Sequence, residues 1–244
     1  MSSFTFKLTL IILFNLIILT LLVVKKKSKK IGVVSLRHNV NVGNNLIKYA
    51  ISIKLKELGY KPFIISIRKR NSLNNITFIN QTTNLVIIKK NFSEIKEDDY
   101  DILMVNSDQT WRKFNEYFYD IGFLKFAENW KIKKFVYGAS IGFDTWQLTK
   151  EDDEIAKKLL KNFKGISVRE EGSIKLIIQH FHLIPTFVLD PTLLIDKKYY
   201  LDIIKDYQGK VVMKGKYIFM YTTNINPFVR GLSKKIGDYF KYDV

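Results

Sequence analysis

The chain has 244 residues and no cysteine, which excludes disulfide bonds, thiolate metal sites and a cysteine nucleophile. Hydrophobic residues make up 47% of the sequence and charged residues 26%, a balance that excludes an intrinsically disordered protein. The formal net charge is +17, but the lysines are scattered without a zinc-finger or arginine-rich pattern, so nucleic acid is not the expected partner. Anionic lipid or a phosphorylated small substrate would suit the same charge.

The first predicted element is an apolar stretch at residues 4–24, followed by the lysine cluster "KKKSKK" at residues 25–30. At about 1.5 Å per residue, this stretch is long enough to cross a hydrocarbon layer of about 30 Å. Because lysine clusters beside a span stay in the cytoplasm, residues 1–30 are expected to form a single-pass anchor in the inner (plasma) membrane. The rest of the chain would then be cytoplasmic.

Two alternatives to an anchor exist for this stretch. A cleaved signal peptide would have its basic residues before the apolar part and small residues at a cleavage site, but only Lys7, near the start of the stretch, is basic, and no such cleavage site follows. A buried core helix of this length would have a polar face, and none is present. An uncleaved anchor is therefore the preferred interpretation.

Short apolar runs then alternate with segments of helical periodicity. This order predicts a doubly wound, Rossmann-like parallel sheet over residues 31–205. The expected strands lie at residues 31–36, 62–67, 84–90, 100–107, 133–140, 165–170 and 186–192. The expected helices lie at residues 44–58 and 150–163, with a short one ending at residue 179.

The helix at residues 150–163 has the most complete sequence pattern. Thr149 is a suitable cap, acidic residues fill the first turn and lysines fill the end, which matches the helix dipole at both termini. Its expected buried stripe is Ile155, Leu159 and Phe163.

The last segment, residues 206–244, is expected to begin a new structural unit with a strand, a loop and a helix. One strand and one helix cannot bury a core of their own. We therefore expect this segment to be the start of a second α/β domain that is cut off.

Polar clusters follow several of the expected strands, at the sheet edge where ligands of open parallel sheets bind. They are "RHNVNVGNN" at 37–45, "NSDQTW" at 106–111, "IGFDTW" at 141–146 and "REEGS" at 169–173. Each cluster alone is typical of ordinary turns. Their occurrence on one edge predicts a substrate site there.

The first loop offers Asn41, Gly43 and Asn44 as substrate-binding residues, because amides at a helix start suit an anion. It has neither a Walker lysine pattern nor G-x-G-x-x-G, so it carries no nucleotide fingerprint. A capped helix with Gly43 in a tight turn is the alternative. His38 is a candidate catalytic proton carrier, although a solvated loop histidine would look the same.

The second loop offers Asp108 as a catalytic acceptor of a hydroxyl proton, with Ser107 and Gln109 binding sugar hydroxyls. Trp111 would stack on a sugar face. The alternative gives Asp108 a capping role and places Trp111 in the core.

Ser140, Arg169, Glu170 and Asp190 complete the predicted substrate site at this edge. Glu170 would orient Arg169 toward an anion, or the two would simply pair with each other. Asp190 either contacts the ligand or fixes a turn before Pro191. No metal site is predicted, and His180 and His182 receive no role.

The order of these pieces resembles the polysaccharide pyruvyl transferase family over residues 31–194. The matching stretches are "NVGNNLIKYAISIKLKELGY", "DYDILMVNSDQTW", "KFVYGASIG", "FKGISVREEGS" and "VLDPTLL". The stretch "SDQTW" is similar to the family's "GSDQVW", with Asn106 in the usual glycine position.

This resemblance implies a two-domain transferase of the GT-B type that moves a pyruvyl group from phosphoenolpyruvate to a sugar of a cell-surface glycan. Phosphoenolpyruvate is a co-substrate, and no other cofactor is implied. A glycan or lipid-linked sugar would be the acceptor, held by the first domain, and the second domain would hold the donor.

The family's second-domain motif of basic and histidine residues is absent from this sequence, so we expect the chain as written to be inactive. The alternatives are a glycosyltransferase-like enzyme that uses a nucleotide sugar, and a non-catalytic membrane-bound remnant.

Overall fold

The computed structural model describes residues 28–35, 42–67, 86–89, 91–106, 108–113, 117–205, 215–220, 222 and 226–242. The predicted span at residues 4–24 lies outside these residues, as do His38, Asn41 and Ser107. Among the helices in the described ranges, none is long and apolar enough to cross a membrane.

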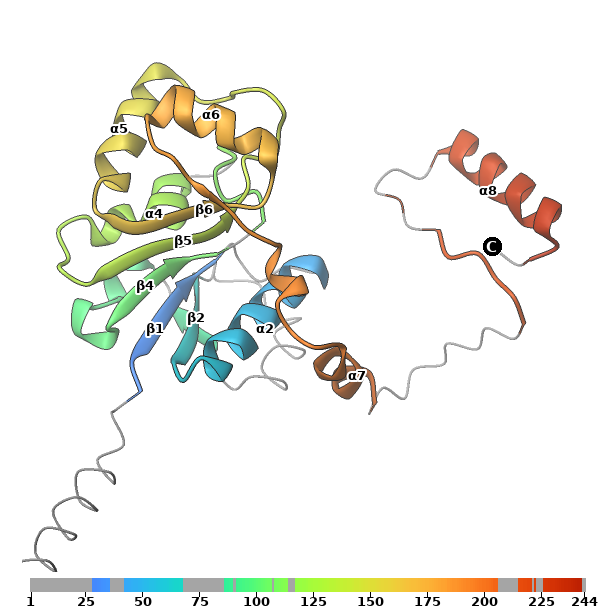
Figure 1. Cartoon of the computed structure of the whole chain (residues 1–244), viewed down its shortest axis with the longest axis horizontal. Helices are drawn as coiled ribbons and strands as arrows, with labels where there is room; N and C mark the ends of the chain where they lie inside the picture. Colours follow the sequence, from blue (N-terminus) through green and yellow to red (C-terminus); the bar gives the residue numbers. More distant parts are fainter. Residues whose placement is uncertain are drawn as a thin grey trace, which may run out of the picture. The chain divides into compact units, whose positions relative to one another are not determined.

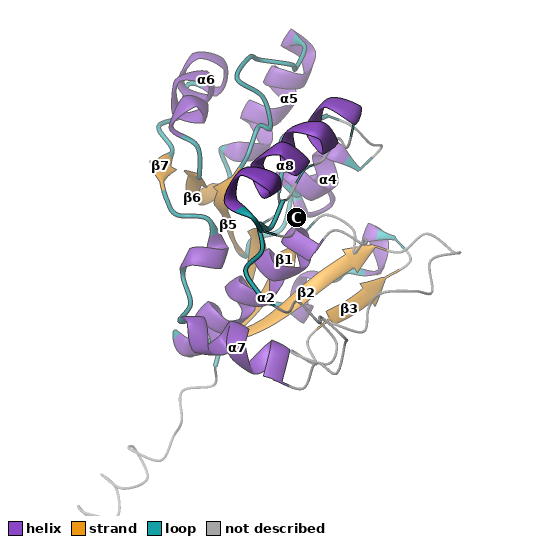
Figure 2. Cartoon of the chain, turned by 90° about the vertical axis from the view of Figure 1, so that its right-hand side faces the viewer, coloured by secondary structure: helices purple, strands orange, loops and turns teal. Residues whose placement is uncertain are grey.

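Within the described residues, seven parallel strands form one sheet in the order β3-β2-β1-β4-β5-β6-β7. They are β1 (Lys30–Val34), β2 (Lys61–Ile67), β3 (Val86–Lys89), β4 (Ile102–Val105), β5 (Lys133–Ala139), β6 (Phe163–Val168) and β7 (Thr186–Phe187). Figure 2 shows β2 and β3 side by side at one edge. The strand order reverses between β1 and β4, which confirms the predicted α/β, Rossmann-like class.

The helices of the described residues follow the strands in alternation. The α-helices are α2 (Val42–Glu57), α4 (Phe118–Phe123), α5 (Lys150–Leu160), α6 (Glu171–Phe181), α7 (Lys197–Lys205) and α8 (Pro227–Phe240). Short 3-10 turns are η1 (Phe92–Glu94), η2 (Glu97–Asp99), η3 (Lys125–Ala127) and η4 (Pro191–Leu193). In Figure 1, α2 lies beside β1 and β2, whereas α5 and α6 lie beside β5 and β6.

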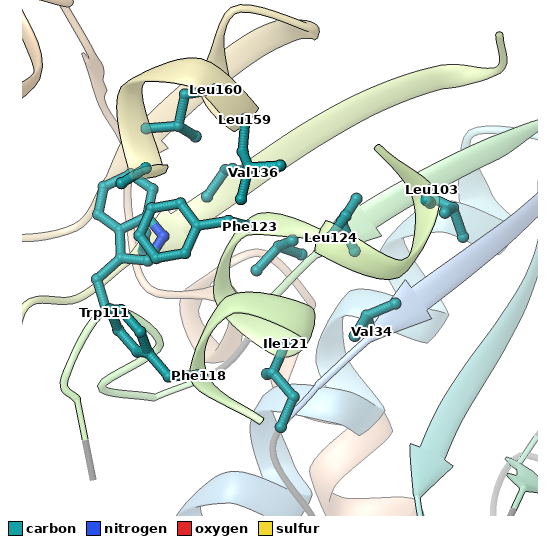
Figure 3. Packing of buried hydrophobic residues seen from close by; sticks show 14 of the residues in the cluster. Val34, Leu103, Trp111, Phe118, Ile121, Phe123, Leu124, Val136, Leu159 and Leu160 are labelled. Atoms are coloured by element: carbon teal, nitrogen blue, oxygen red, sulfur yellow. The ribbon is translucent and has the colours of Figure 1, made fainter. Parts of the chain in front are cut away.

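Two hydrophobic clusters cover the two faces of the sheet. Successive strand residues point to opposite faces, so Val33 packs with α2 in one cluster and Val34 packs in the other. The larger cluster takes side chains from α4, α5 and α6. Figure 3 shows Phe123 of α4 and Leu159 of α5 in this cluster. With both faces covered, the strands are the buried apolar runs that a parallel sheet requires.

The helix expected at residues 150–163 ends earlier than its periodicity predicts. It stops at Leu160, and Phe163 begins β6 instead of completing the helical stripe. Phe163 pairs with Lys134 of β5. Strand pairing therefore places Phe163 in the sheet, although its spacing also fits the helical pattern.

The strand expected at residues 186–192 is also shorter than predicted, since β7 has only two residues. The side chain of Asp190 accepts hydrogen bonds from the backbone N and Oγ1 of Thr192, at 2.9 and 2.6 Å. These bonds turn the chain into η4, and Pro191 has no N–H to donate to a neighbouring strand.

The chain divides into two compact units, residues 1–199 and 200–244. In the second unit, α8 begins after Asn226, whose side chain accepts a hydrogen bond from Val229 N at 2.9 Å. The strand expected before this helix is not present among residues 215–220, where only Tyr217 forms an isolated bridge.

Candidate functional site

A pocket of about 450 Å³ lies at the carboxyl edge of the sheet, where β4, β5 and β6 end. Five of the predicted site residues line it: Asp108, Gln109, Ser140, Arg169 and Glu170. The other lining residues are Gly142, Phe143, Asp144, Gly172 and Ser173. The pocket therefore joins three of the four polar loops that the sequence places at this edge.

Arg169 is the central side chain of the pocket. Its Nε lies 3.0 Å from Glu170 Oε1, its Nη1 lies 2.7 Å from Asp190 Oδ2, and its Nη2 pairs with Asp108 Oδ1. Burial alone would lower the pKa of Arg169, but its bonds to Glu170 and Asp108 outweigh burial, and the pKa is raised. The guanidinium therefore stays charged and holds three carboxylates from three loops.

The pocket wall is acidic on balance. Asp108, Asp144 and Glu170 contribute three carboxylates, against the single guanidinium of Arg169. Each donor-bearing nitrogen of that guanidinium already has a carboxylate partner. Unused carboxylate lone pairs accept hydrogen bonds from hydroxyl groups, so the arrangement suits a hydroxyl-rich ligand better than an anion.

A backbone hydrogen bond joins the loop after β4 to the end of β5 beside the pocket. The backbone N of Trp111 donates to Ser140 O at 3.0 Å, and Ser140 is buried. Gln109 has a φ of 44°, in the left-handed region that non-glycine residues seldom adopt. Gln109 and Ser140 thus both line the pocket, and their predicted role in binding substrate stays a prediction.

Trp111 lies in the core, which is the second of its two predicted placements, and it does not line the pocket. Its side chain is 1% exposed, and its Nε1 donates to Gly122 O at 2.9 Å. The ring stacks on Phe123 with a centroid distance of 5.6 Å, inside the larger cluster (Figure 3). Trp111 belongs to the core because α4 packs over the end of β4 and covers it.

Gly43 and Asn44 lie in the first turn of α2 and do not line the pocket. Gly43 is exposed and Asn44 is buried. Of the remaining predicted residues, Asp190 reaches the site through its ion pair with Arg169. His38, Asn41 and Ser107 lie outside the described residues.

Phe143 and Asp144 are two of the five pocket residues that the sequence analysis did not name individually. Both lie in the polar stretch after β5, where the strand-end rule already placed a cluster. Their spacing matches no catalytic motif, so only the folded loop identifies them. Within the described residues, no group of three or more His, Asp or Glu side chains is arranged to hold a metal ion.

Comparison with known proteins identifies the family of the chain. No curated protein sequence matches the chain significantly. The family profile for "Polysaccharide pyruvyl transferase" matches residues 41–239, which include the pocket and most of the second unit. This match covers the main body of the sequence, and the chain therefore belongs to the polysaccharide pyruvyl transferase family.

Proposed function

We propose that this protein transfers a pyruvyl group from phosphoenolpyruvate to a sugar of a cell-surface glycan, and that the pocket at the ends of β4, β5 and β6 binds the acceptor sugar. The observation that carries the proposal is the carboxylate-rich wall around Arg169, in a chain of this family. A glycan or lipid-linked sugar supplies the hydroxyl groups that such a wall binds.

The reaction adds two sugar hydroxyls to C2 of phosphoenolpyruvate. Two C–O bonds form, the C2–O bond to phosphate breaks, and the methylene carbon becomes a methyl group. Of the two hydroxyl protons, one balances the new methyl group and the other leaves with phosphate. Asp108 is the proposed acceptor of a hydroxyl proton, since its carboxylate lies on the pocket wall and is fixed by Arg169.

The same proposal assigns the donor to the second domain of a GT-B architecture, of which residues 200–244 would be part. Its support is the family profile, which continues to residue 239. Phosphoenolpyruvate carries two anionic groups, and the acidic pocket around Arg169 does not suit them.

The first test uses the protein joined to a donor domain that has the family's basic and histidine motif, and measures phosphate release from phosphoenolpyruvate with and without a pyruvate-free surface polysaccharide. We expect release only when both are present, and we expect Asp108→Asn to lower it by about a hundredfold or more, as loss of a general base does. Asp98→Asn is the matched control, because Asp98 is exposed in η2, before β4 and away from the pocket.

Two results would count against the proposal. Turnover of a nucleotide sugar without phosphoenolpyruvate would identify a glycosyltransferase instead. Loss of the thermal unfolding transition in Asp108→Asn would make Asp108 a structural residue.

We also propose that residues 4–24 anchor the protein in the inner (plasma) membrane, with the remaining chain on the cytoplasmic side. The support comes from the length and apolar character of this segment and from the lysines that follow it. Such an anchor would keep the enzyme near lipid-linked sugars, which are assembled at a membrane surface.

A further inference from the structure

An aromatic ring forms part of the pocket wall. Phe143 lines the pocket next to Asp144 and is 40% exposed. The guanidinium carbon of Arg112 lies 4.5 Å from the centroid of this ring. A planar cation at that distance covers one part of the ring, and the exposed fraction of Phe143 leaves surface that a ligand can contact.

Arg112 is itself held in place by the neighbouring loop. Its Nη1 donates to Gln109 Oε1 at 2.8 Å, and its backbone N donates to Gln109 O at 3.0 Å. Both bonds come from one short loop after β4, so Arg112 supports the ring with little remaining freedom. A supported ring loses little entropy when a ligand packs on it.

Gly142, next to Phe143 in the loop after β5, packs closely against the side chain of Gln109. A Cβ at Gly142 would lie 2.9 Å from Gln109 Cγ, closer than real Cβ contacts, and the φ of Gly142 is +77°. Only glycine therefore combines this backbone conformation with this close approach. The close contact between Gly142 and Gln109 therefore holds the loops after β4 and β5 together and positions the ring of Phe143.

A ring beside carboxylates is a combination that matches a sugar. A pyranose has C–H groups that pack on an aromatic face and hydroxyls that donate to carboxylates. The wall has three carboxylates, those of Asp108, Asp144 and Glu170, and one guanidinium, that of Arg169. Arg169 is already paired with Asp108, Glu170 and Asp190, so a carboxylate-bearing sugar would meet like charge.

We propose that Phe143 is the stacking platform for the acceptor sugar, and that the pocket takes a neutral pyranose in preference to a uronic acid. This inference rests on the proposed acceptor role of the pocket. It assigns to Phe143 the stacking role that the sequence suggested for Trp111. Phe143 is a positioning residue, and Asp108 remains the proposed proton acceptor.

The test uses the whole chain and measures binding of methyl glucopyranoside, methyl galactopyranoside and galacturonate by saturation-transfer NMR and calorimetry. We expect Phe143→Ala to weaken binding of a neutral pyranoside about three- to tenfold, the range for one aromatic contact. Phe143→Trp should retain binding, and the emission of the new indole should change when the sugar is added.

The matched control is Phe187→Ala, since Phe187 is 47% exposed on β7 and does not line the pocket. It should leave pyranoside binding unchanged. Thermal unfolding of each variant reports whether the fold is intact. If Phe143→Ala is unstable, the change in indole emission of Phe143→Trp on adding sugar still tests whether position 143 contacts the ligand.

The outcomes separate this inference from the proposed function. Unchanged affinity in Phe143→Ala, or galacturonate binding as tightly as the neutral sugars, overturns the inference. If Asp108→Asn still weakens binding in that case, the acceptor site stands without the stacking role. If no pyranoside binds and the glycan has no effect on phosphate release, both proposals fail.

Discussion

At the scale of single residues, Arg169 joins parts of the chain that are far apart in sequence. It follows β6 and pairs with Asp108 after β4 and with Asp190 after β7. The predicted pair with its neighbour Glu170 is confirmed, but the partners 61 and 21 residues away were not predictable from spacing. Arg169 thereby gathers carboxylates that would otherwise repel one another.

Lys48 is a second unusual residue, and it lies outside the pocket. It is fully buried in α2, and its Nζ has no hydrogen-bond partner among the described residues. Helical spacing from Ile51 and Leu55 places it on the side of α2 that packs on the sheet. Burial lowers the pKa of Lys48 from the usual 10.5 to about 7.

We predict that Lys48→Met raises the free energy of unfolding by about 1–3 kcal/mol near pH 7, because a buried group without a partner is replaced by an apolar one of similar size. Between pH 7 and 10.5 the unfolded lysine binds a proton that folded Lys48 lacks, so wild-type stability rises with pH in this range. The substitution should remove that slope.

Urea unfolding at pH 7 and pH 9 measures both effects. Lys56→Met is the control, since Lys56 is exposed on the same helix. A loss of stability in Lys48→Met would show that the amine is satisfied in the folded protein.

At the scale of elements, the start of α5 combines a predicted cap with an unpredicted network. Thr149 Oγ1 accepts from Asp152 N at 3.2 Å, and Thr149 N donates to Asp152 Oδ2 at 3.0 Å, which confirms Thr149 as the cap. Asp152 is also buried, and its Oδ1 lies 2.6 Å from Lys113 Nζ and accepts a hydrogen bond from the hydroxyl of Tyr119. One carboxylate thus ties α5 to α4 and to the loop after β4.

These contacts predict an acid-sensitive contribution to stability. Burial would raise the pKa of Asp152, but hydrogen bonds from Lys113, Tyr119 and Thr149 outweigh it and hold the pKa well below the usual 3.8. The contribution is therefore complete above about pH 4 and is lost as the pH falls toward the folded pKa.

We predict that Asp152→Asn lowers the free energy of unfolding by about 1–3 kcal/mol at pH 7 and flattens the acid side of the stability profile. Thermal unfolding between pH 3 and pH 7 measures this. Glu151→Gln, an exposed change in the same turn, should have little effect. Equal profiles for the wild type and Asp152→Asn would contradict the network.

At the scale of the whole molecule, the proposed anchor leads to a fractionation experiment. We predict that the full chain resists alkaline carbonate extraction from membranes, and that Leu13→Arg combined with Leu16→Arg releases it. Each arginine near the centre of a span costs about 2.5–3.5 kcal/mol on the insertion scale. Lys27→Arg is the control, and extraction of the unchanged chain would refute the anchor.

The sequence alone determined the class of the sheet and the edge at which the candidate pocket lies. Apolar runs such as residues 102–105 are local signals, and β-α alternation allows few topologies. It also indicated Asp108, Gln109, Ser140, Arg169 and Glu170, because strand-end loops share an edge in any parallel sheet. These inferences need only local pattern and chain order.

Only the tertiary structure decided which aromatic residue the pocket exposes. Trp111 and Phe143 both follow strands, but α4 buries the first, while the second remains at the pocket wall. The tertiary structure also decided that Arg169 forms ion pairs with three carboxylates. It decided as well that Lys48 is buried and that its Nζ has no hydrogen-bond partner among the described residues. Burial and pairing depend on which distant segments pack together, and no local pattern in the chain encodes those contacts.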